Sequence, residues 1–288
     1  MNNLLRTLVW DGQVSLTVAD TTDIVKKAVA LHGLSVASAT VLGKTLSAMT
    51  FMSACLKEET GEISLSVKCD GTGGEIGVSG NKKLFLRGYI ENTQAQAEQG
   101  KEESALLGAN GSLTVIRDDG YSRPFVGACA FPQTVSVDAA FEEYFRISEQ
   151  LPTRIATVVK FDENGTLVFA GVAVLQPLPF ADEQTLQKTW DISLNEVLSA
   201  VQKQGIEESV KAYFVIDKSV WEWRNAQYKC NCSRQYLTRV LVSLGEAQMR
   251  HIIKEDGAVR VHCHYCNIDY EFTDTDADRI FPKEYKRI

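Results

Sequence analysis

Four cysteines gather in the last fifth of the 288-residue chain, in the pattern C-x-C, thirty residues, C-x-x-C. Four thiolates bind Zn²⁺ in a tetrahedron with bonds of about 2.3 Å, and a C-x-x-C turn brings two sulfurs onto one metal. The C-x-C pair precedes an expected helix, whose N-terminal dipole favours the thiolate form. The spacing therefore predicts a zinc site with the ligands Cys230, Cys232, Cys263 and Cys266.

Three histidines near these cysteines are alternative ligands. His262 and His264 flank Cys263, and His251 lies earlier in the chain. Imidazole also binds zinc, but four cysteines already complete a tetrahedral shell. We therefore expect a site of four cysteines, with His262 and His264 placed to modulate the Cys263 thiolate.

Such a site supports two interpretations, which the residues alone leave open. The metal can hold together a segment that is too small to build a large core. Alternatively, the metal-bound thiolates can be oxidised, and the stabilisation that came from metal binding is then lost. In the second case the site is a redox switch for whatever packs beside it.

The composition indicates a globular protein without a basic surface. The formal net charge of −7 disfavours general binding to nucleic acids or anionic membranes. No apolar run approaches the length of a membrane span, and the N-terminal residues do not resemble a signal peptide. We therefore expect a cytoplasmic protein with reduced thiols, in which Cys55, Cys69 and Cys129 are small buried apolar residues.

Residues 1–180 are expected to form one α+β domain with a substantial antiparallel sheet and packed helices. Asp119-Gly120 and Asn164-Gly165 predict the turns of two hairpins. Helices are expected in TTDIVKKAVALHG, which ends at Gly33, and in SVDAAFEEYFRISEQ, which ends before Pro152. The polar segment 93–107 is expected to form a loop or a mobile segment.

Two further parts follow the domain. A helical, aromatic-rich linker is expected at 181–228, after the stretch PLP. One apolar helix face is predicted in it from the helical spacing of Trp190, Leu194, Val197, Leu198 and Val201. So much apolar surface must pack on something, and the first domain is the simplest partner. Residues 229–288 are expected to form the small C-terminal zinc module, with two helices that end at glycines and a hairpin whose turn carries the second cysteine pair.

Two stretches of the chain resemble segments of one known family. These are KCNCS with the thirty-residue gap and VHCHYCNIDYEF, and EEYFRISEQLPTRI, which is similar to a YF-x-x-SEQ-x-P-T segment. The chain resembles the heat shock protein 33 family of redox-regulated chaperones over essentially its whole length. His264 departs from the acidic or neutral residue of some relatives, but it leaves the ligand pattern intact.

The resemblance implies an ATP-independent holdase of the bacterial cytosol rather than an enzyme. The reduced, zinc-bound form would be inactive. Hypochlorite, or peroxide with mild heat, would form the disulfides Cys230–Cys232 and Cys263–Cys266, release zinc, and unfold the linker and the module. The uncovered surface would bind unfolding client proteins and prevent their aggregation, and the active form would dimerise. The linker residues that suit client binding are Trp190, Leu194, Val197, Phe214, Trp221 and Trp223.

Two alternative functions start from the same cysteines. Zinc knuckles often bind RNA, but residues 229–288 contain ten Lys or Arg and nine Asp or Glu, and a charge of +1 is weak for phosphate binding. A thiol oxidoreductase would use Cys263 and Cys266, but their C-x-x-C is expected on a hairpin rather than at the start of a helix. We therefore expect neither nucleic acid nor a membrane as a partner.

Overall fold

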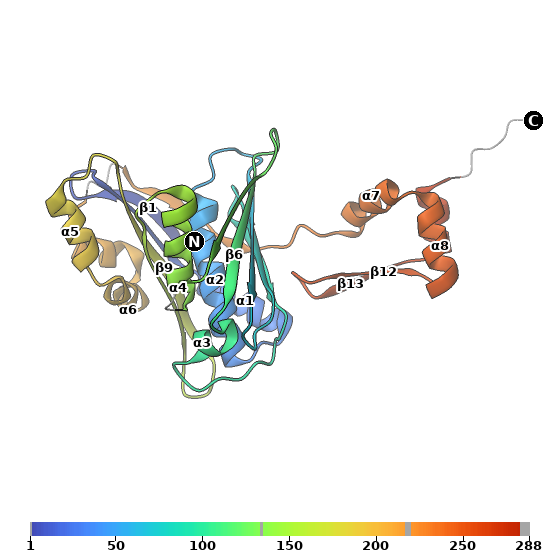
Figure 1. The fold of residues 1–288 in the computed structure, drawn as a ribbon, viewed down its shortest axis with the longest axis horizontal. Helices are drawn as coiled ribbons and strands as arrows, with labels where there is room; N and C mark the ends of the chain where they lie inside the picture. The colour runs from blue at the N-terminus through green and yellow to red at the C-terminus, as the bar shows by residue number, and fades with distance from the viewer. Residues whose placement is uncertain (1, 133–134, 217–219, 283–288) are drawn as a thin grey trace, which may run out of the picture. The chain divides into compact units, whose positions relative to one another are not determined.

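The computed structural model describes residues 2–132, 135–216 and 220–282. Contacts divide the chain into two compact units, Met1–Lys229 and Cys230–Ile288 (Figure 1). The expected linker, 181–228, belongs by its contacts to the first unit. The functional division into domain, linker and module stays a prediction, and the end of the expected module, 283–288, lies outside the described residues.

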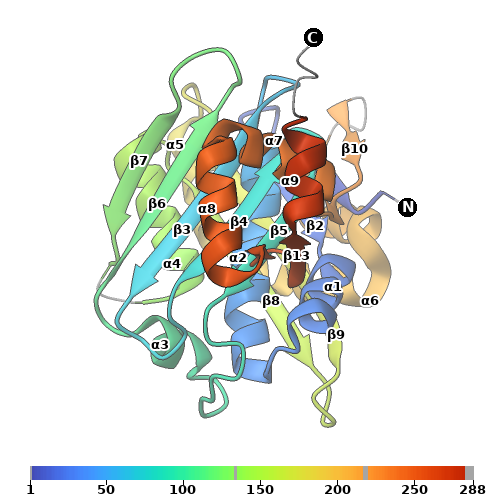
Figure 2. The same cartoon turned by 90° about the vertical axis from the view of Figure 1, so that its right-hand side faces the viewer.

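The first unit contains two mostly antiparallel sheets, so the α+β class is confirmed. Their strand orders are β10-β1-β2-β9-β8 and β11-β5-β4-β3-β6-β7, and Figure 2 shows β7, β6, β3, β4 and β5 side by side. The hairpins expected at Asp119-Gly120 and Asn164-Gly165 are confirmed as β6–β7 and β8–β9. The strands of the first sheet are β1 (Leu4–Val9), β2 (Val14–Asp20), β8 (Arg154–Phe161), β9 (Leu167–Pro177) and β10 (Glu222–Arg224). Those of the second are β3 (Glu62–Cys69), β4 (Ile76–Asn81), β5 (Phe85–Ile90), β6 (Gly111–Asp118), β7 (Phe125–Ala130) and β11 (Gln227–Tyr228).

A buried helix, α2 (Val36–Ala54), lies between the two sheets (Figure 1). Apart from Lys44, which forms an ion pair with Glu103, its side chains are small or apolar, which is typical of a helix that is buried on most sides. The Ser35 side chain caps its start by accepting a hydrogen bond from the Ser38 N–H. Gly43 allows a close approach, because a Cβ there would lie 2.8 Å from the Val25 side chain.

Three shorter helices complete the domain. The helix expected to end at Gly33 is confirmed as α1 (Thr22–His32), with Gly33 left-handed at φ 59°. The helix expected before Pro152 is α4 (Val137–Tyr144), which continues as a π-helical turn, η1 (Phe145–Glu149). The expected loop at 93–107 is wrong in part, because α3 (Glu102–Leu107) forms there and buries its two leucines in the core.

The linker packs on the outer face of the first sheet. Along β1, Leu4 joins the core that contains α2, and Leu5 joins the second core, which contains α6. Figure 1 accordingly shows α5 (Glu183–Asp191) and α6 (Leu194–Tyr213) on the side of that sheet opposite α2. The linker is therefore docked on the first domain in this structure.

The second unit has the two helices and the hairpin expected from its sequence. Both helices end at the expected glycines, Gly245 and Gly257, and a third helix follows the hairpin. The elements are α7 (Arg234–Leu244), α8 (Glu246–Asp256), β12 (Val259–Cys263), β13 (Ile268–Phe272) and α9 (Asp274–Ile280). Its core is small and consists of Leu241, Met249, Ile253, Val259, Phe272 and Ala277. Among the described residues of the whole chain, no helix is long and apolar enough to cross a membrane.

Candidate metal centre

The four predicted ligands come from two places in the second unit. Cys230 and Cys232 lie in the irregular segment before α7, and the Ser233 side chain caps this helix by accepting a hydrogen bond from the Tyr236 N–H. The helix start is therefore fixed directly after the C-x-C pair. This capping serine places Cys232 next to the positive end of the α7 dipole.

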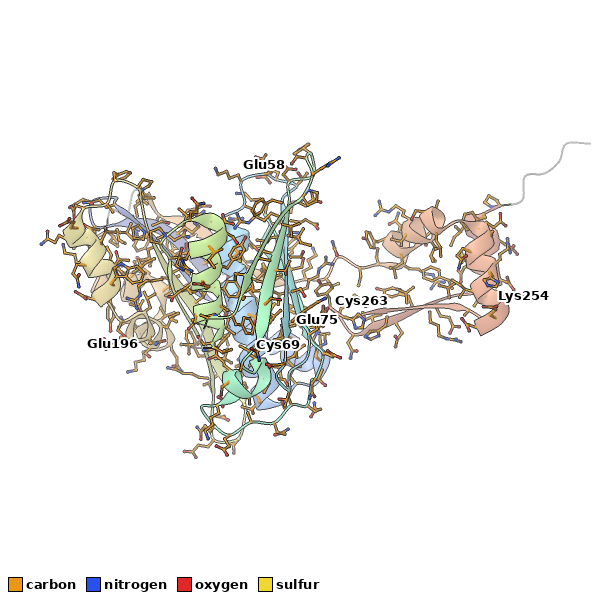
Figure 3. The ribbon with its side chains drawn as sticks, viewed as in Figure 1. Glu58, Cys69, Glu75, Glu196, Lys254 and Cys263 are labelled. Carbon is orange, nitrogen blue, oxygen red and sulfur yellow. The ribbon has the colours of Figure 1, made fainter. Side chains whose placement is uncertain are left out.

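The other two cysteines lie at the tip of the hairpin. Cys263 ends β12 (Figure 3), and Cys266 lies in the turn that leads to β13. The N–H groups of Cys266 and Asn267 both donate to the Cys263 carbonyl, at 3.2 and 2.8 Å. Asn267 has a φ of 54°, in the left-handed region that asparagine tolerates. The tight turn aims both sulfurs at one point.

The four sulfur atoms form a compact cluster. All lie within 4.8 Å of one another. The Cys230 and Cys263 sulfurs are 3.7 Å apart, and those of Cys232 and Cys266 are 3.1 Å apart. Zn–S bonds of about 2.3 Å in a regular tetrahedron require sulfur–sulfur distances of about 3.8 Å. The sulfurs of Cys230 and Cys263 thus have nearly the spacing that zinc requires, and those of Cys232 and Cys266 need to move apart by less than 1 Å. The residues present therefore fit a tetrahedral metal ion.

Ionisation within the cluster is uneven. Burial raises the pKa of Cys230 to about 11 and also raises the pKa of Cys266. Burial opposes ionisation of Cys232 as well, but hydrogen bonds from the Tyr270 hydroxyl, 3.4 Å away, and from neighbouring thiols lower its pKa to about 7. A cation bound among the sulfurs would favour all four thiolates and remove this asymmetry.

Arg234, the first residue of α7, ties the C-x-C segment to the rest of the second unit. Its guanidinium donates to the Glu271 carbonyl at 2.8 Å, forms an ion pair with Asp276 at 2.8 Å, and lies 4.4 Å from the centroid of the Phe272 ring. Neither Arg234 nor Tyr270 was predicted from the sequence. A usable signal was the alternation in IDYEF, which places Tyr270 two positions from Phe272 on one face of β13.

The nearby histidines lie outside the four-sulfur cluster found among the described residues. His262 is 2.8 Å from a carboxylate oxygen of Asp269, and its ring centroid is 5.0 Å from that of His264. His251 faces Glu255 on α8 at 3.5 Å. These contacts leave the tetrahedral arrangement to sulfur alone.

The other three cysteines lie in the first unit and include Cys69, labelled in Figure 3. Cys129 is buried, as expected, whereas Cys55 and Cys69 are only partly buried against the core. Burial raises the pKa of all three thiols, to about 11 for Cys129. These thiols therefore ionise poorly near neutral pH.

Five of the six predicted client-binding residues lie in or against the second core of the first unit, which contains α6. Leu194, Val197 and Phe214 are buried, and the Phe214 ring lies 5.5 Å from that of Trp10 on the domain. Trp221 and Trp223 are partly buried, with ring centroids 6.0 Å apart. Their role in client binding stays a prediction.

Trp190 does not share a helix face with Leu194 and Val197, so that expectation is wrong. The chain is extended at Ile192, and the Ser193 side chain starts a new helix by accepting a hydrogen bond from the Glu196 N–H. Trp190 therefore lies in the last turn of a separate helix, α5, and is 51% exposed. The S-x-x-E spacing of Ser193 and Glu196 was the sequence signal for this break.

Comparison with known proteins gives a consistent result. The family model described as Hsp33 protein matches residues 2–273. A 33 kDa chaperonin of Clostridium perfringens is 30% identical over 298 aligned positions, which cover 100% of this chain and 93% of the relative. A 33 kDa chaperonin of Acetivibrio thermocellus is 33% identical, with 96% of each chain covered.

The fold also matches a solved structure. The crystal structure of the 33 kDa chaperonin (heat shock protein 33 homolog) of Thermotoga maritima superimposes with a TM-score of 0.80 at 21% identity, covering 97% of each chain. The similarity therefore covers elements of both units rather than one shared domain.

Proposed function

Because the chain belongs to the Hsp33 protein family, we propose that it is a molecular chaperone controlled by the redox state of its cysteine cluster. It acts as an ATP-independent holdase in the cytoplasm, where it binds unfolding proteins and prevents their aggregation. The observation that carries the redox part of this proposal is the convergence of four thiols, all within 4.8 Å of one another, in a unit with a small core.

Cys230, Cys232, Cys263 and Cys266 would hold one zinc ion. When bound, the ion holds the four thiolates together and thereby ties the start of α7 to the hairpin tip. In the described part of the second unit, residues 230–282, the core cluster has six buried side chains, so metal binding supplies a large share of the stability of this unit. The metal is thus structural in the reduced, inactive form.

Oxidation removes the ligands. Each disulfide forms when two thiolates give two electrons to an oxidant such as hypochlorite, which is reduced to chloride. The proposed pairs are Cys230–Cys232 and Cys263–Cys266. The two cysteines of each pair are near each other in the sequence, so each disulfide forms only a very small loop. Such loops constrain the rest of the chain little, so they do not replace the cross-connection that the metal provided.

The linker is the proposed effector of the switch. Its buried residues, including Val197 and Phe214, pack on the first sheet and would be uncovered if it undocked. The exposed apolar groups would then bind client segments that lack a folded core. The active form is proposed to dimerise, as the family resemblance implies.

The test is to measure zinc per chain and suppression of client aggregation, before and after oxidant, on the same preparation. We expect one zinc per chain and weak suppression in the reduced protein, and then metal loss and strong suppression after oxidation. Oxidised, zinc-free protein that leaves aggregation unchanged would refute the proposal. Turnover of a disulfide substrate, or salt-dependent RNA binding, would favour the alternatives.

A further inference from the structure

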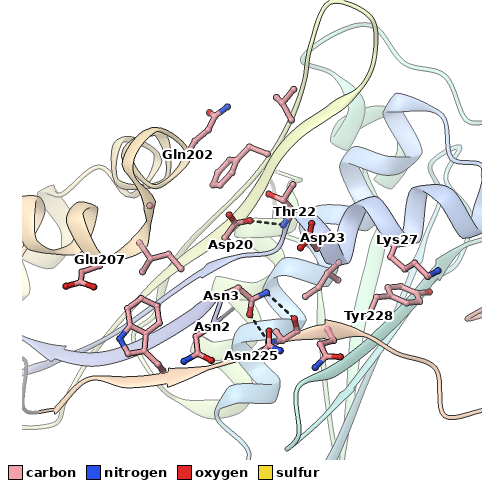
Figure 4. Close-up of a pocket in the computed structure, with 18 of the residues that line it drawn as sticks. Asn2, Asn3, Asp20, Thr22, Asp23, Lys27, Gln202, Glu207, Asn225 and Tyr228 are labelled. Atoms are coloured by element: carbon pink, nitrogen blue, oxygen red, sulfur yellow. Dashed lines mark hydrogen bonds between the residues drawn. The ribbon is translucent and has the colours of Figure 1, made fainter.

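Residues 222–229, which we call the edge strip, run along edges of both sheets of the first unit. β10 pairs antiparallel with β1, and β11 pairs parallel with β5. Between these two pairings, the Asn3 side chain acts like a strand backbone. Its amide donates to the Ala226 carbonyl at 3.0 Å, and its oxygen accepts from the Ala226 N–H at 2.7 Å (Figure 4).

The strip ends on β5, one residue before Cys230. The N–H groups of Gln227 and Lys229 donate to the carbonyls of Leu84 and Leu86, at 2.9 and 2.8 Å. Alternate residues of an edge strand direct their backbone groups outward, so Gly88 is the next to require a partner. The backbone of the strip supplies none, because the chain passes at Cys230 into the second unit.

The Tyr228 hydroxyl completes this edge. It donates to the Gly88 carbonyl at 3.0 Å and accepts from the Gly88 N–H at 3.3 Å. It also lies 3.3 Å from Nε2 of His32, the last residue of α1. One hydroxyl therefore joins β11, β5 and α1, and it satisfies both backbone groups of a buried residue.

We propose that Tyr228 is a positioning residue that latches the edge strip onto β5 and so couples the cysteine cluster to the linker. This inference rests on the proposed function and adds a residue through which the switch acts. When the second unit loses its order, the disordered chain begins one residue beyond Lys229. Fraying must then break the bonds of Tyr228 before it can reach Ala226 and the tryptophans of the linker.

The latch opposes undocking of the linker until the hydrogen bonds of Tyr228 are broken. Breaking it leaves the buried N–H and carbonyl of Gly88 without partners, which opposes fraying beyond Lys229. The hydrogen bond of Lys229 to Leu86 is lost before the latch, and the bond of Gln227 to Leu84 and the Asn3 pair are lost after it. The order of loss along the strip is therefore set from the end nearest to Cys230.

The test compares Tyr228→Phe with wild type, both reduced and zinc-loaded. The ring stays in place, so we expect unchanged zinc content and an unchanged second unit. Amide hydrogen exchange at Gly88 and at residues 226–229 should become about tenfold faster, which corresponds to about 1.4 kcal/mol. Aggregation suppression should then appear at a lower dose of oxidant than in wild type.

Tyr121→Phe is the matched control, because Tyr121 is 78% exposed on the β6–β7 hairpin. It should leave both exchange and oxidant dose unchanged. Unchanged exchange in Tyr228→Phe would overturn the latch, whether or not the protein is a chaperone. Faster exchange with an unchanged oxidant dose would overturn the coupling alone. Wild-type protein that stays inactive after oxidation would instead refute the proposed function, which the exchange data do not depend on.

Discussion

The sulfur atoms of Cys232 and Cys266 lie 3.1 Å apart, although 34 positions separate them in the sequence. They belong to different elements, since Cys232 precedes α7 and Cys266 follows β12. A metal held there would close a long loop of chain in a unit with a small core. Loss of the metal should therefore affect this whole unit and not only the turn.

Substitution of Cys266 tests this dependence. Cys266→Ser removes one thiolate from the tetrahedron, so we expect loss of bound zinc and loss of folded structure in the second unit. The four tryptophans all lie in the first unit, so the change should be measured in amide spectra of residues 230–282. Cys69→Ser, in the first unit, is the control and should retain one zinc per chain. Full zinc content in Cys266→Ser would contradict a four-cysteine site.

Arg154 holds the end of α5 and should control the docking of that helix. Its guanidinium donates to the carbonyls of Thr189, Trp190 and Ile192, at 3.0, 2.6 and 3.1 Å, and lies 5.7 Å from the Trp190 ring centroid. Arg154→Lys keeps the charge but replaces the planar guanidinium that lies over the Trp190 ring with a compact ammonium. We expect α5 to undock with a loss of about 1–2 kcal/mol.

The measurement is hydrogen exchange of residues 183–191 together with quenching of Trp190 fluorescence. Both should increase in Arg154→Lys. Arg146→Lys is matched to it, because Arg146 forms an exposed ion pair with Glu143 at 2.7 Å and should contribute little. Equal exchange in the two variants would mean that Arg154 does not retain α5.

Val197 tests whether burial of the linker restrains activity. It lies at 0% exposure in the core shared by α6 and the first sheet. Val197→Ala should destabilise this packing by about 1–3 kcal/mol. We expect the reduced protein to bind more of a dye that reports exposed apolar surface. We also expect it to suppress client aggregation in part, with zinc retained. Val36→Ala, at an exposed helix start, should change neither property, and a similar response from both variants would argue against release of the linker.

The local signals in the sequence predicted much of this molecule, whereas its long-range pairings were not predictable. Gly33, Gly245 and Gly257 ended helices as expected, because a residue with positive φ stops a helix wherever the chain lies in the fold. The cysteine cluster was predictable because ligand spacing reflects the geometry of the metal. By contrast, the contact between Tyr228 and Gly88 joins residues 140 positions apart, and no local pattern specifies it.

Trp190 shows a different cause of error. A helical period continued through Ile192, but the cap supplied by Ser193 competes with the apolar stripe and wins at that point. Helix α3 shows the opposite error, because a helix forms where a loop was expected. Its polar surroundings predicted a loop, but Leu106 and Leu107 gain enough burial against the core to fix one short helix.

Asp138 should make the stability of the first unit depend on pH. Its carboxylate accepts hydrogen bonds from the N–H and hydroxyl of Thr157, and burial nevertheless raises its pKa to about 6, against the opposing effect of Lys44. The unfolded chain releases this proton near pH 4, so between about pH 4 and 6 the folded state holds a proton that the unfolded state has lost. The contribution of Asp138 to stability therefore falls as pH rises through this window, by about 1–3 kcal/mol for a half-buried group.

Asp138→Asn keeps an oxygen for Thr157 and stays neutral at every pH. Relative to wild type, this variant should gain stability as the pH rises from 4 to 7, measured by denaturant unfolding with tryptophan fluorescence, which reports the first unit alone. Asp119 gives a control of opposite sign, because hydrogen bonds from the N–H groups of Ser122 and Tyr121 lower its pKa. As the pH rises through the acid range, Asp119→Asn should lose stability relative to wild type. Parallel stability curves for wild type and Asp138→Asn would show that Asp138 ionises as easily in the folded protein as in the unfolded chain.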